Sequence, residues 1–317
     1  MSRHARSKGL ALVIVLFILT IMSVSVAWLA EEMVFSLRHA ENVRDSEQAW
    51  QVLAGSEAWA VSVLARDRQE NAADHPGESW KNLGSAVTIE RGQLSTDIED
   101  VQGRFNINNL LDEAQGDAPQ GERPRVWIPA FQRLLLALEL DPGLADAVLD
   151  WLDTDQEVRG INGAEDNDYL GLTPPYRAAN RAFSDISELL WVKGFDEQVL
   201  QKLAPYVIAL PVKGVPININ TASPQLLRIL GRNLLSIQDA EQLVADIPPE
   251  TGYSIEDFLK HDSMAGEQDI AVPLIDDKSD YFVINSRAVV GKARMSMNSV
   301  VERKDGLITV IKRVPVL

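Results

Sequence analysis

A long apolar segment opens the chain. Residues 10–30 contain no charged side chain, follow a leader with three Arg and Lys residues, and are followed by Glu31 and Glu32. About 20 apolar residues are enough to cross the hydrocarbon core of a bilayer as a helix. Because basic residues are retained on the cytoplasmic side of a membrane, the pattern predicts a single-pass transmembrane helix at Leu10–Ala30 with the bulk of the protein on the far side.

Two other readings of this segment stay open on length and charge alone. A cleaved secretory signal has an apolar core of 7–15 residues and a small-residue cleavage site. The segment here is longer, and no such site precedes Glu31. A plain N-terminal anchor, in contrast, fits the length of the segment equally well.

The helical pattern continues beyond the predicted membrane segment. No Gly or Pro occurs between Leu10 and Ala54, and apolar residues recur at helical spacing on one side. We expect one helix over about residues 10–67, with its first half in lipid and its second half packed on a soluble domain; two helices that break near Gly55 are the alternative. The apolar face predicted to pack against partner helices comprises Met33, Leu37, Ala40 and Leu53.

The remainder alternates between strand-like and helical segments. Short alternating patterns predict strands at 86–90, 93–100 and 105–108, and longer ones at 281–290, 293–303 and 307–314, whereas 128–267 has helical periodicity. An isolated pair of strands is only marginally stable. We therefore predict an α+β fold in which early and late strands form one antiparallel sheet on the long helix, with the helical block inserted between them. Two separate domains in series are the alternative.

Composition excludes several classes of function. The formal net charge of −16 opposes binding to nucleic acid. The absence of cysteine excludes thiolate metal sites and cysteine nucleophiles. The sequence contains no zinc-hydrolase pairing of histidines, no P-loop and no G-x-S-x-G elbow. The segment ININTASPQLLRILG lacks the glycine-rich hairpin that would bind a phosphate backbone, so we interpret it as a packing module.

An acidic loop is the strongest candidate for a binding site. Seven carboxylates lie between positions 150 and 168, with Arg159 as the single basic residue among them. Ca²⁺ prefers six to eight oxygen ligands in a flexible geometry, although the D-x-D-x-E spacing is not that of an EF-hand. On spacing alone, a solvated acidic loop without metal remains an alternative. The predicted calcium ligands are Asp153, Asp155, Glu157, Glu165, Asp166 and Asp168.

Several segments together resemble a known family. Lys8-Gly9 directly before an apolar helix resembles the leader of type IV prepilins and type II secretion pseudopilins. The ordered segments that resemble the minor pseudopilin K family (general secretion pathway protein K) are KGLALVIVL, FNINNL, DTDQEV, EDNDYL, PYRAANRAFSDISELLWVKG, PYVIALP, ININTAS and MSMNSVVER.

This resemblance implies a fold with the following units. A pseudopilin fold, in which a long N-terminal helix packs on an antiparallel sheet, carries a large inserted all-α domain with subdomains similar to SAM or helix-hairpin-helix folds. The expected units are a prepilin leader at 1–9, a transmembrane helix at 10–30, the pseudopilin helix and first strands at 31–110, the inserted domain at 111–278 and the final strands at 279–317.

The resemblance also implies a role in secretion. The chain would be cut by prepilin peptidase between Gly9 and Leu10, methylated at Leu10, and held in the bacterial inner membrane with its bulk in the periplasm. It would act without catalysis at the tip of the pseudopilus, with the minor pseudopilins I and J and other pseudopilins, in export of folded proteins across the outer membrane. The family carries calcium in its helical domain, which favours a structural calcium ion in the acidic loop. A signal-anchored periplasmic adaptor or enzyme unrelated to pilus assembly is the alternative.

One departure from the general pilin pattern fits a tip position. Pilins carry a glutamate at the fifth residue after the cleavage site, where it neutralises the N-terminal amine of the neighbouring subunit. The fifth residue here is Ile14. Because an uncompensated carboxylate in lipid is costly, its absence suits a subunit that has no other subunit docked ahead of it.

Overall fold

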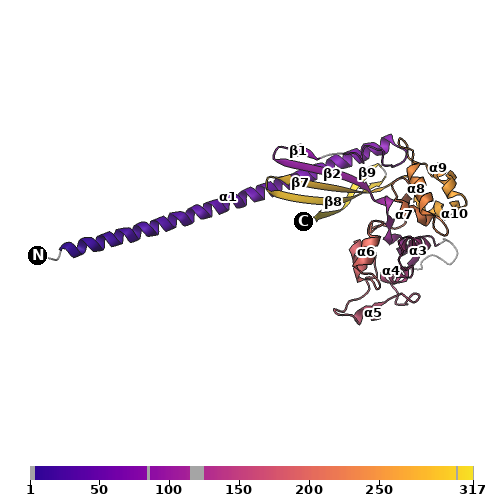
Figure 1. The fold of residues 1–317 in the computed structure, drawn as a ribbon, viewed down its shortest axis with the longest axis horizontal. Helices are drawn as coiled ribbons and strands as arrows, with labels where there is room; N and C mark the ends of the chain where they lie inside the picture. The colour runs from indigo at the N-terminus through magenta and orange to yellow at the C-terminus, as the bar shows by residue number, and fades with distance from the viewer. Residues whose placement is uncertain (1–3, 84–85, 115–124, 305, 317) are drawn as a thin grey trace.

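The first helix dominates the shape of the molecule. The computed structural model describes residues 4–83, 86–114, 125–304 and 306–316. Helix α1 runs without a break from His4 to Glu70 and projects far beyond the rest of the chain (Figure 1). At 1.5 Å per residue its 67 residues span about 100 Å. The prediction of one continuous helix is confirmed, and Gly55 lies inside it with open space where a side chain would be.

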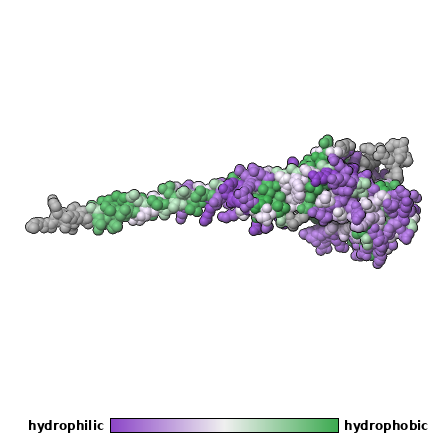
Figure 2. All heavy atoms as spheres, turned by 90° about the horizontal axis from the view of Figure 1, so that it is seen from above, coloured by the Kyte–Doolittle hydropathy of each residue, from purple (hydrophilic) through white to green (hydrophobic). Residues whose placement is uncertain are grey.

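The apolar N-terminal part of α1 has no covering layer within the described part of the chain. Its large apolar side chains are at least half exposed from Leu10 to Leu29, and Figure 2 shows this stretch as mostly hydrophobic, with paler patches between the green ones. Among the described residues, α1 is the one helix long and apolar enough to cross a membrane. This exposure is what a lipid-embedded segment requires.

A five-stranded antiparallel sheet packs on the other half of α1. Its strand order is β1-β2-β7-β8-β9. The strands are β1 (Val87–Ile89), β2 (Gly92–Asp100), β7 (Tyr281–Val290), β8 (Ala293–Lys304) and β9 (Leu307–Val316). The pairing of β2 with β7 confirms that early and late strands share one sheet, as the sequence pattern predicts.

The sheet buries one face of α1. Ala49 and Leu53 pack against Ala288, Val290 and Met297. Further along the helix, a second cluster is formed by Ala60, Leu64, Trp80, Ile98, Phe282, Ile284 and Val301. Removing such apolar surface from water stabilises the unit by roughly 25 cal/mol per Å².

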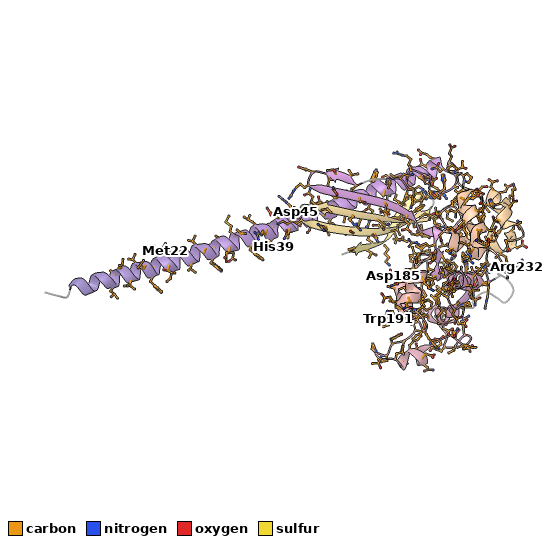
Figure 3. All side chains as sticks on the ribbon, viewed as in Figure 1. Met22, His39, Asp45, Asp185, Trp191 and Arg232 are labelled. Atoms are coloured by element: carbon orange, nitrogen blue, oxygen red, sulfur yellow. The ribbon has the colours of Figure 1, made fainter. Side chains whose placement is uncertain are left out.

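The burial of Leu53 corrects one prediction. Its side chain is 0% exposed, so it is not available to a partner helix. The assignment was wrong because the chain's own sheet covers the side of the helix on which Leu53 lies. Met33, Leu37 and Ala40 lie on the stretch beyond the sheet, where Figure 3 labels Met22 and His39, and remain exposed.

The inserted domain consists of short helices that hang from the sheet at the end of α1 (Figure 1). Its α-helices are α2 (Leu111–Ala114), α3 (Trp127–Ala137), α4 (Leu144–Leu152), α5 (Asp166–Leu170), α6 (Glu197–Leu203), α7 (Pro224–Leu227), α8 (Ile237–Ala245), α9 (Ile255–Lys260) and α10 (Gln268–Ala271). Turns of 3₁₀ helix lie at Val101–Gly103, Ile107–Leu110, Ile186–Trp191, Arg228–Leu230, Asp262–Met264 and Val272–Leu274. Two parallel strand pairs join β3 (Phe105–Asn106) to β4 (Val207–Ile208) and β5 (Ile217–Asn218) to β6 (Ile275–Asp276).

The boundary of the inserted domain lies earlier than predicted. Phe105, Ile107 and Leu110 belong to the hydrophobic core of the insertion, where Phe105 packs on Phe131. Asn108 donates to the backbone carbonyls of Phe183 and Leu210 at 2.9 and 2.7 Å. The predicted start at residue 111 is therefore wrong, because the segment at 105–110 pairs with a strand about 100 residues further along and not with the sheet.

Candidate cation site and assembly face

The acidic loop connects α4 to α5. Asp153 caps the end of α4, and Glu165 precedes the first residue of α5. The fold brings oxygen atoms of Asp153, Asp155 and Glu165 within 4.8 Å of one another. Figure 1 shows α5 at the outer end of the inserted domain, away from the sheet. Three of the six predicted ligands therefore form one cluster.

The oxygens of this cluster suit a cation. Oδ1 of Asp153 and both carboxylate oxygens of Glu165 are buried and accept no hydrogen bond. These two side chains belong to residues that are 0% and 2% exposed. A buried carboxylate is costly unless it is paired. A hard divalent cation would give all three orphaned oxygens a partner, and carboxylate oxygens are the ligands that Ca²⁺ prefers.

The electrostatics of the cluster support this interpretation. Burial, followed by repulsion from Asp150, Asp153 and Asp155, raises the pKa of Glu165 to about 8. Burial also raises the pKa of Asp150 to about 6. The Arg159 guanidinium bonds Oδ2 of Asp153 at 2.8 and 3.0 Å, which leaves Oδ1 of the same carboxylate unpaired. The loop therefore holds more buried negative charge than one arginine neutralises.

Glycine is required at one point of the loop. A Cβ atom on Gly163 would lie 2.2 Å from the Arg159 carbonyl oxygen and 2.3 Å from Oδ2 of Asp150. The chain thus passes directly over the Asp150 carboxylate, which accepts from the Arg159 backbone N–H at 3.1 Å. Asp150 is fully buried beside the cluster, where its charge repels that of Glu165. It was not among the predicted ligands, because it lies within the apolar end of α4.

The other three predicted ligands have local roles. Glu157 is exposed, and its backbone N–H donates to Asp155. Asp166 forms an ion pair with Arg177 at 2.9 Å. Asp168 accepts from the Glu165 backbone N–H at 3.2 Å and so closes the first turn of α5. The structure does not bring these three carboxylates into the cluster, so the predicted ligand set is narrowed to Asp153, Asp155 and Glu165.

A second candidate surface runs along α1. Gly9 and Leu10 lie near the N-terminal end of this helix. Val43 and Trp50 are 44% and 43% exposed on the stretch that packs on the sheet. Together with other exposed residues at helical spacing, Val43 and Trp50 define an outward face of α1. This outward face comprises Met33, Leu37, Ala40, Val43, Trp50 and Ala54. The sequence pattern missed Val43 and Trp50, because only the position of the sheet identifies which side of the helix stays free.

Comparisons with known proteins agree with this architecture. The family described as Type II secretion system (T2SS), protein K matches residues 103–212 and residues 217–275. The chain is 34% identical to Type II secretion system protein K of Pseudomonas aeruginosa, over 96% of this chain and 92% of that protein. It is 31% identical to the protein of the same name from Aeromonas hydrophila, over 97% of both chains.

A solved structure extends the likeness to the fold. A chain in the crystal structure of the GspK-GspI-GspJ complex from the enterotoxigenic Escherichia coli type 2 secretion system superposes with a TM-score of 0.76 and 25% sequence identity. The likeness covers 88% of this chain and 99% of that one. The chain described here therefore belongs to the family of type II secretion system protein K.

Proposed function

We propose that this chain is the tip subunit of the type II secretion pseudopilus, where it assembles with the minor pseudopilins I and J. The observation that supports this most directly is the likeness to a chain from a GspK-GspI-GspJ complex, which extends over nearly the whole fold. The proposed role is assembly for protein export and not catalysis. The long apolar helix would hold the chain in the inner membrane, with the sheet and the inserted domain in the periplasm.

The position of the inserted domain favours the tip. It hangs to one side at the end of α1 that is remote from the apolar segment (Figure 1). A helix in a bundle occupies a cylinder only about 10–12 Å across. A subunit with this overhang fits at the end of a filament, because in the middle it would obstruct the subunit above.

Co-expression tests the assignment of partners. The full chain, tagged at its C-terminus, is expected to retain the I and J pseudopilins of the same organism when it is purified from detergent-solubilised membranes. Recovery of the chain without either pseudopilin would contradict the proposed assembly.

Processing by prepilin peptidase is part of the proposal. Lys8-Gly9 precedes the apolar segment directly, and cleavage would place Leu10 at the new N-terminus. The family to which the chain belongs supports the proposal that prepilin peptidase cuts the leader and that Leu10 is then methylated. The absence of a carboxylate at Ile14 then suits the subunit that enters the filament first.

A structural calcium ion is the proposed cofactor. Asp153, Asp155 and Glu165 would hold it, and the bound ion would give a partner to the oxygens of Asp153 and Glu165 that are buried without a hydrogen bond. The chain's own residues prepare the site: Arg159 orients Asp153, and Asp168 fixes the turn that presents Glu165. The loop between α4 and α5 would then keep one conformation.

Calcium is expected to stabilise the chain against unfolding. At a free concentration about 100-fold above the dissociation constant, a ligand of the folded state contributes about 2.7 kcal/mol. The Asp153→Asn variant should lose most of this response, whereas Glu157→Gln, a change in the same loop outside the cluster, should keep it. Thermal unfolding of the three proteins in calcium and in chelator measures the difference.

The pH dependence of calcium binding follows from Glu165. Because the pKa of this carboxyl is raised to about 8 without metal, binding must displace its proton. Affinity should therefore fall as the pH decreases below 8. An unchanged melting temperature in chelator would contradict the calcium proposal, and an equal loss of response in Glu157→Gln would contradict the narrowed ligand set.

A further inference from the structure

A second carboxylate cluster lies where α1 meets the inserted domain. Asp67 from the last turn of α1, and Asp74 and Glu78 from the segment that follows, place oxygen atoms within 4.8 Å of one another. Their side chains are only 1%, 4% and 2% exposed. Arg303, on β8, lies among them with 2% of its side chain exposed. Two of these three buried carboxylates, Asp67 and Asp74, thus share one buried guanidinium.

The two aspartates have donors on both oxygens. Asp67 accepts from Arg303 Nη1 at 3.0 Å and from Asn71 Nδ2 at 2.8 Å. Asp74 accepts from Arg303 Nη2 through one oxygen and from the Ser279 backbone N–H at 2.8 Å through the other. With these oxygens engaged, the cluster is a poor cation site, unlike the loop at Asp153, where orphaned oxygens face one another.

Glu78 differs from its two neighbours. Its Oε2 accepts from the Trp80 indole N–H at 2.6 Å and from the His75 backbone N–H at 3.1 Å. Its Oε1 is buried and has no hydrogen-bond partner. An orphaned carboxylate oxygen in a buried, negatively charged environment is the position at which a proton lowers the free energy most.

The surrounding groups do not neutralise the excess charge. On α1, Arg68 is 38% exposed and lies 3.9 Å from Asp74. Nε2 of His75 lies 4.0 Å from Oε1 of Glu78, but burial lowers the pKa of His75, and its Nδ1 accepts from the Gly77 N–H. Three further carboxylates add negative charge to this region. They are Asp280 in the segment before β7, Asp100 at the end of β2 and Glu302 on β8.

We propose that this cluster takes up one proton as the pH falls through neutrality, on Oε1 of Glu78, and that the proton clamps the end of α1 to the inserted domain. Burial, the largest influence on this carboxyl, raises the pKa of Glu78 to about 7, against an ordinary value of 4.5. Since the pKa is higher in the folded state, the stabilisation is complete at acid pH and is lost as the pH rises through about 7.

The clamp depends on the segment that carries Asp74 and Glu78. The Asp74 backbone N–H donates to the Asp277 carbonyl at 2.9 Å, and its carbonyl accepts from Asn218 of β5 at 3.0 Å. A Cβ atom on Gly77 would lie 2.2 Å from the Pro249 carbonyl oxygen, so the segment also fits closely against the loop after α8. Loss of the proton adds a negative charge beside Asp67 and Asp74 and weakens this junction.

Trp80 supplies a direct reporter for the proton. The full chain in detergent micelles is examined by ¹H–¹⁵N NMR from pH 5 to pH 9. The indole resonance of Trp80, assigned with Trp80→Phe, is expected to titrate with a midpoint near 7. Glu78→Gln should abolish the titration, and Glu256→Gln, an exposed carboxylate on α9, should leave it unchanged.

Two further readouts complete the test. Asp67→Asn removes a neighbouring negative charge and should move the midpoint to lower pH. Amide hydrogen exchange at residues 74–79, corrected for its intrinsic pH dependence, should accelerate about tenfold between pH 6 and pH 8.5 in the unmodified chain and not in Glu78→Gln. An indole resonance that does not titrate, or the same titration in Glu78→Gln, would overturn the proposal.

Discussion

Replacing residues 103–276 with a short turn is expected to abolish protein export while leaving the anchored helix and sheet folded. The replacement is feasible because Asp100 and Phe282 are paired neighbours on β2 and β7, so a few residues can join these strands. The two clusters between α1 and the sheet contain no residue of the deleted segment. The variant retains Gln102, Ser279 and Asp280. It therefore keeps the hydrogen bond from the Ser279 hydroxyl to Asp100 and that from the Asp280 backbone N–H to Gln102.

Export would fail because the overhanging part of the tip is missing. The measurement is the activity of a secreted enzyme in the culture medium, compared with the activity retained in the periplasm. Control experiments show that the variant is present in the membrane fraction and melts cooperatively. Normal export by a stable, membrane-inserted variant would rule out the tip role of the inserted domain.

Replacing Gly9 with valine is expected to block maturation completely. The peptidase would no longer cut before Leu10, so the basic leader would stay attached and the N-terminus would not be methylated. Insertion should continue, because the apolar segment at residues 10–30 is unchanged and its length still matches the bilayer. The charged leader would have to enter the hydrocarbon core when the subunit moves out with the growing filament, which is costly. Export should therefore be lost as well.

Intact mass and N-terminal sequence of protein from membranes measure this effect. Lys8→Arg, which keeps the leader charge, is the matched control and should be processed normally. An unmodified chain that starts at Met1 or Ser2 would indicate a plain anchor, and one that starts near Glu31 would indicate a secretory signal. The same N-terminus in the unmodified chain and in Gly9→Val would exclude cleavage at this site.

The spacing of apolar residues along the chain was enough to predict the long helix and most strands of the sheet. The apolar segment and the helical spacing after it identified α1, and alternating residues identified β2, β7, β8 and β9. The strand at Phe105 was found but assigned to the wrong unit, since its partner β4 lies about 100 residues away. Leu53 was misassigned for a related reason: helical spacing shows that a face is apolar but not which neighbour covers it.

Residue type alone predicted the loop that forms the candidate cation site, and three of the six predicted ligands lie in its cluster. Crowding of carboxylates identified the loop, and Asp153, Asp155 and Glu165 do come together. Asp166 and Asp168 are equally acidic, yet Arg177 and the first turn of α5 engage them locally. Capping bonds and ion pairs over a few residues decide which oxygens stay free, and the spacing of acidic residues does not contain that information. Glu78 illustrates the same limit, because its hydrogen-bond partner Trp80 packs against Phe282, which is about 200 residues further along the chain.

Site-specific photo-cross-linking from α1 tests the central claim most directly. A photoreactive residue at position 50, on the outward face, is compared with one at position 53, which the chain's own sheet covers. We expect position 50 to form adducts with pseudopilin I or J in membranes of the secreting organism and position 53 to react within the chain. Adducts from position 50 that contain neither pseudopilin, or equal labelling of a pseudopilin from both positions, would contradict the proposed assembly along α1.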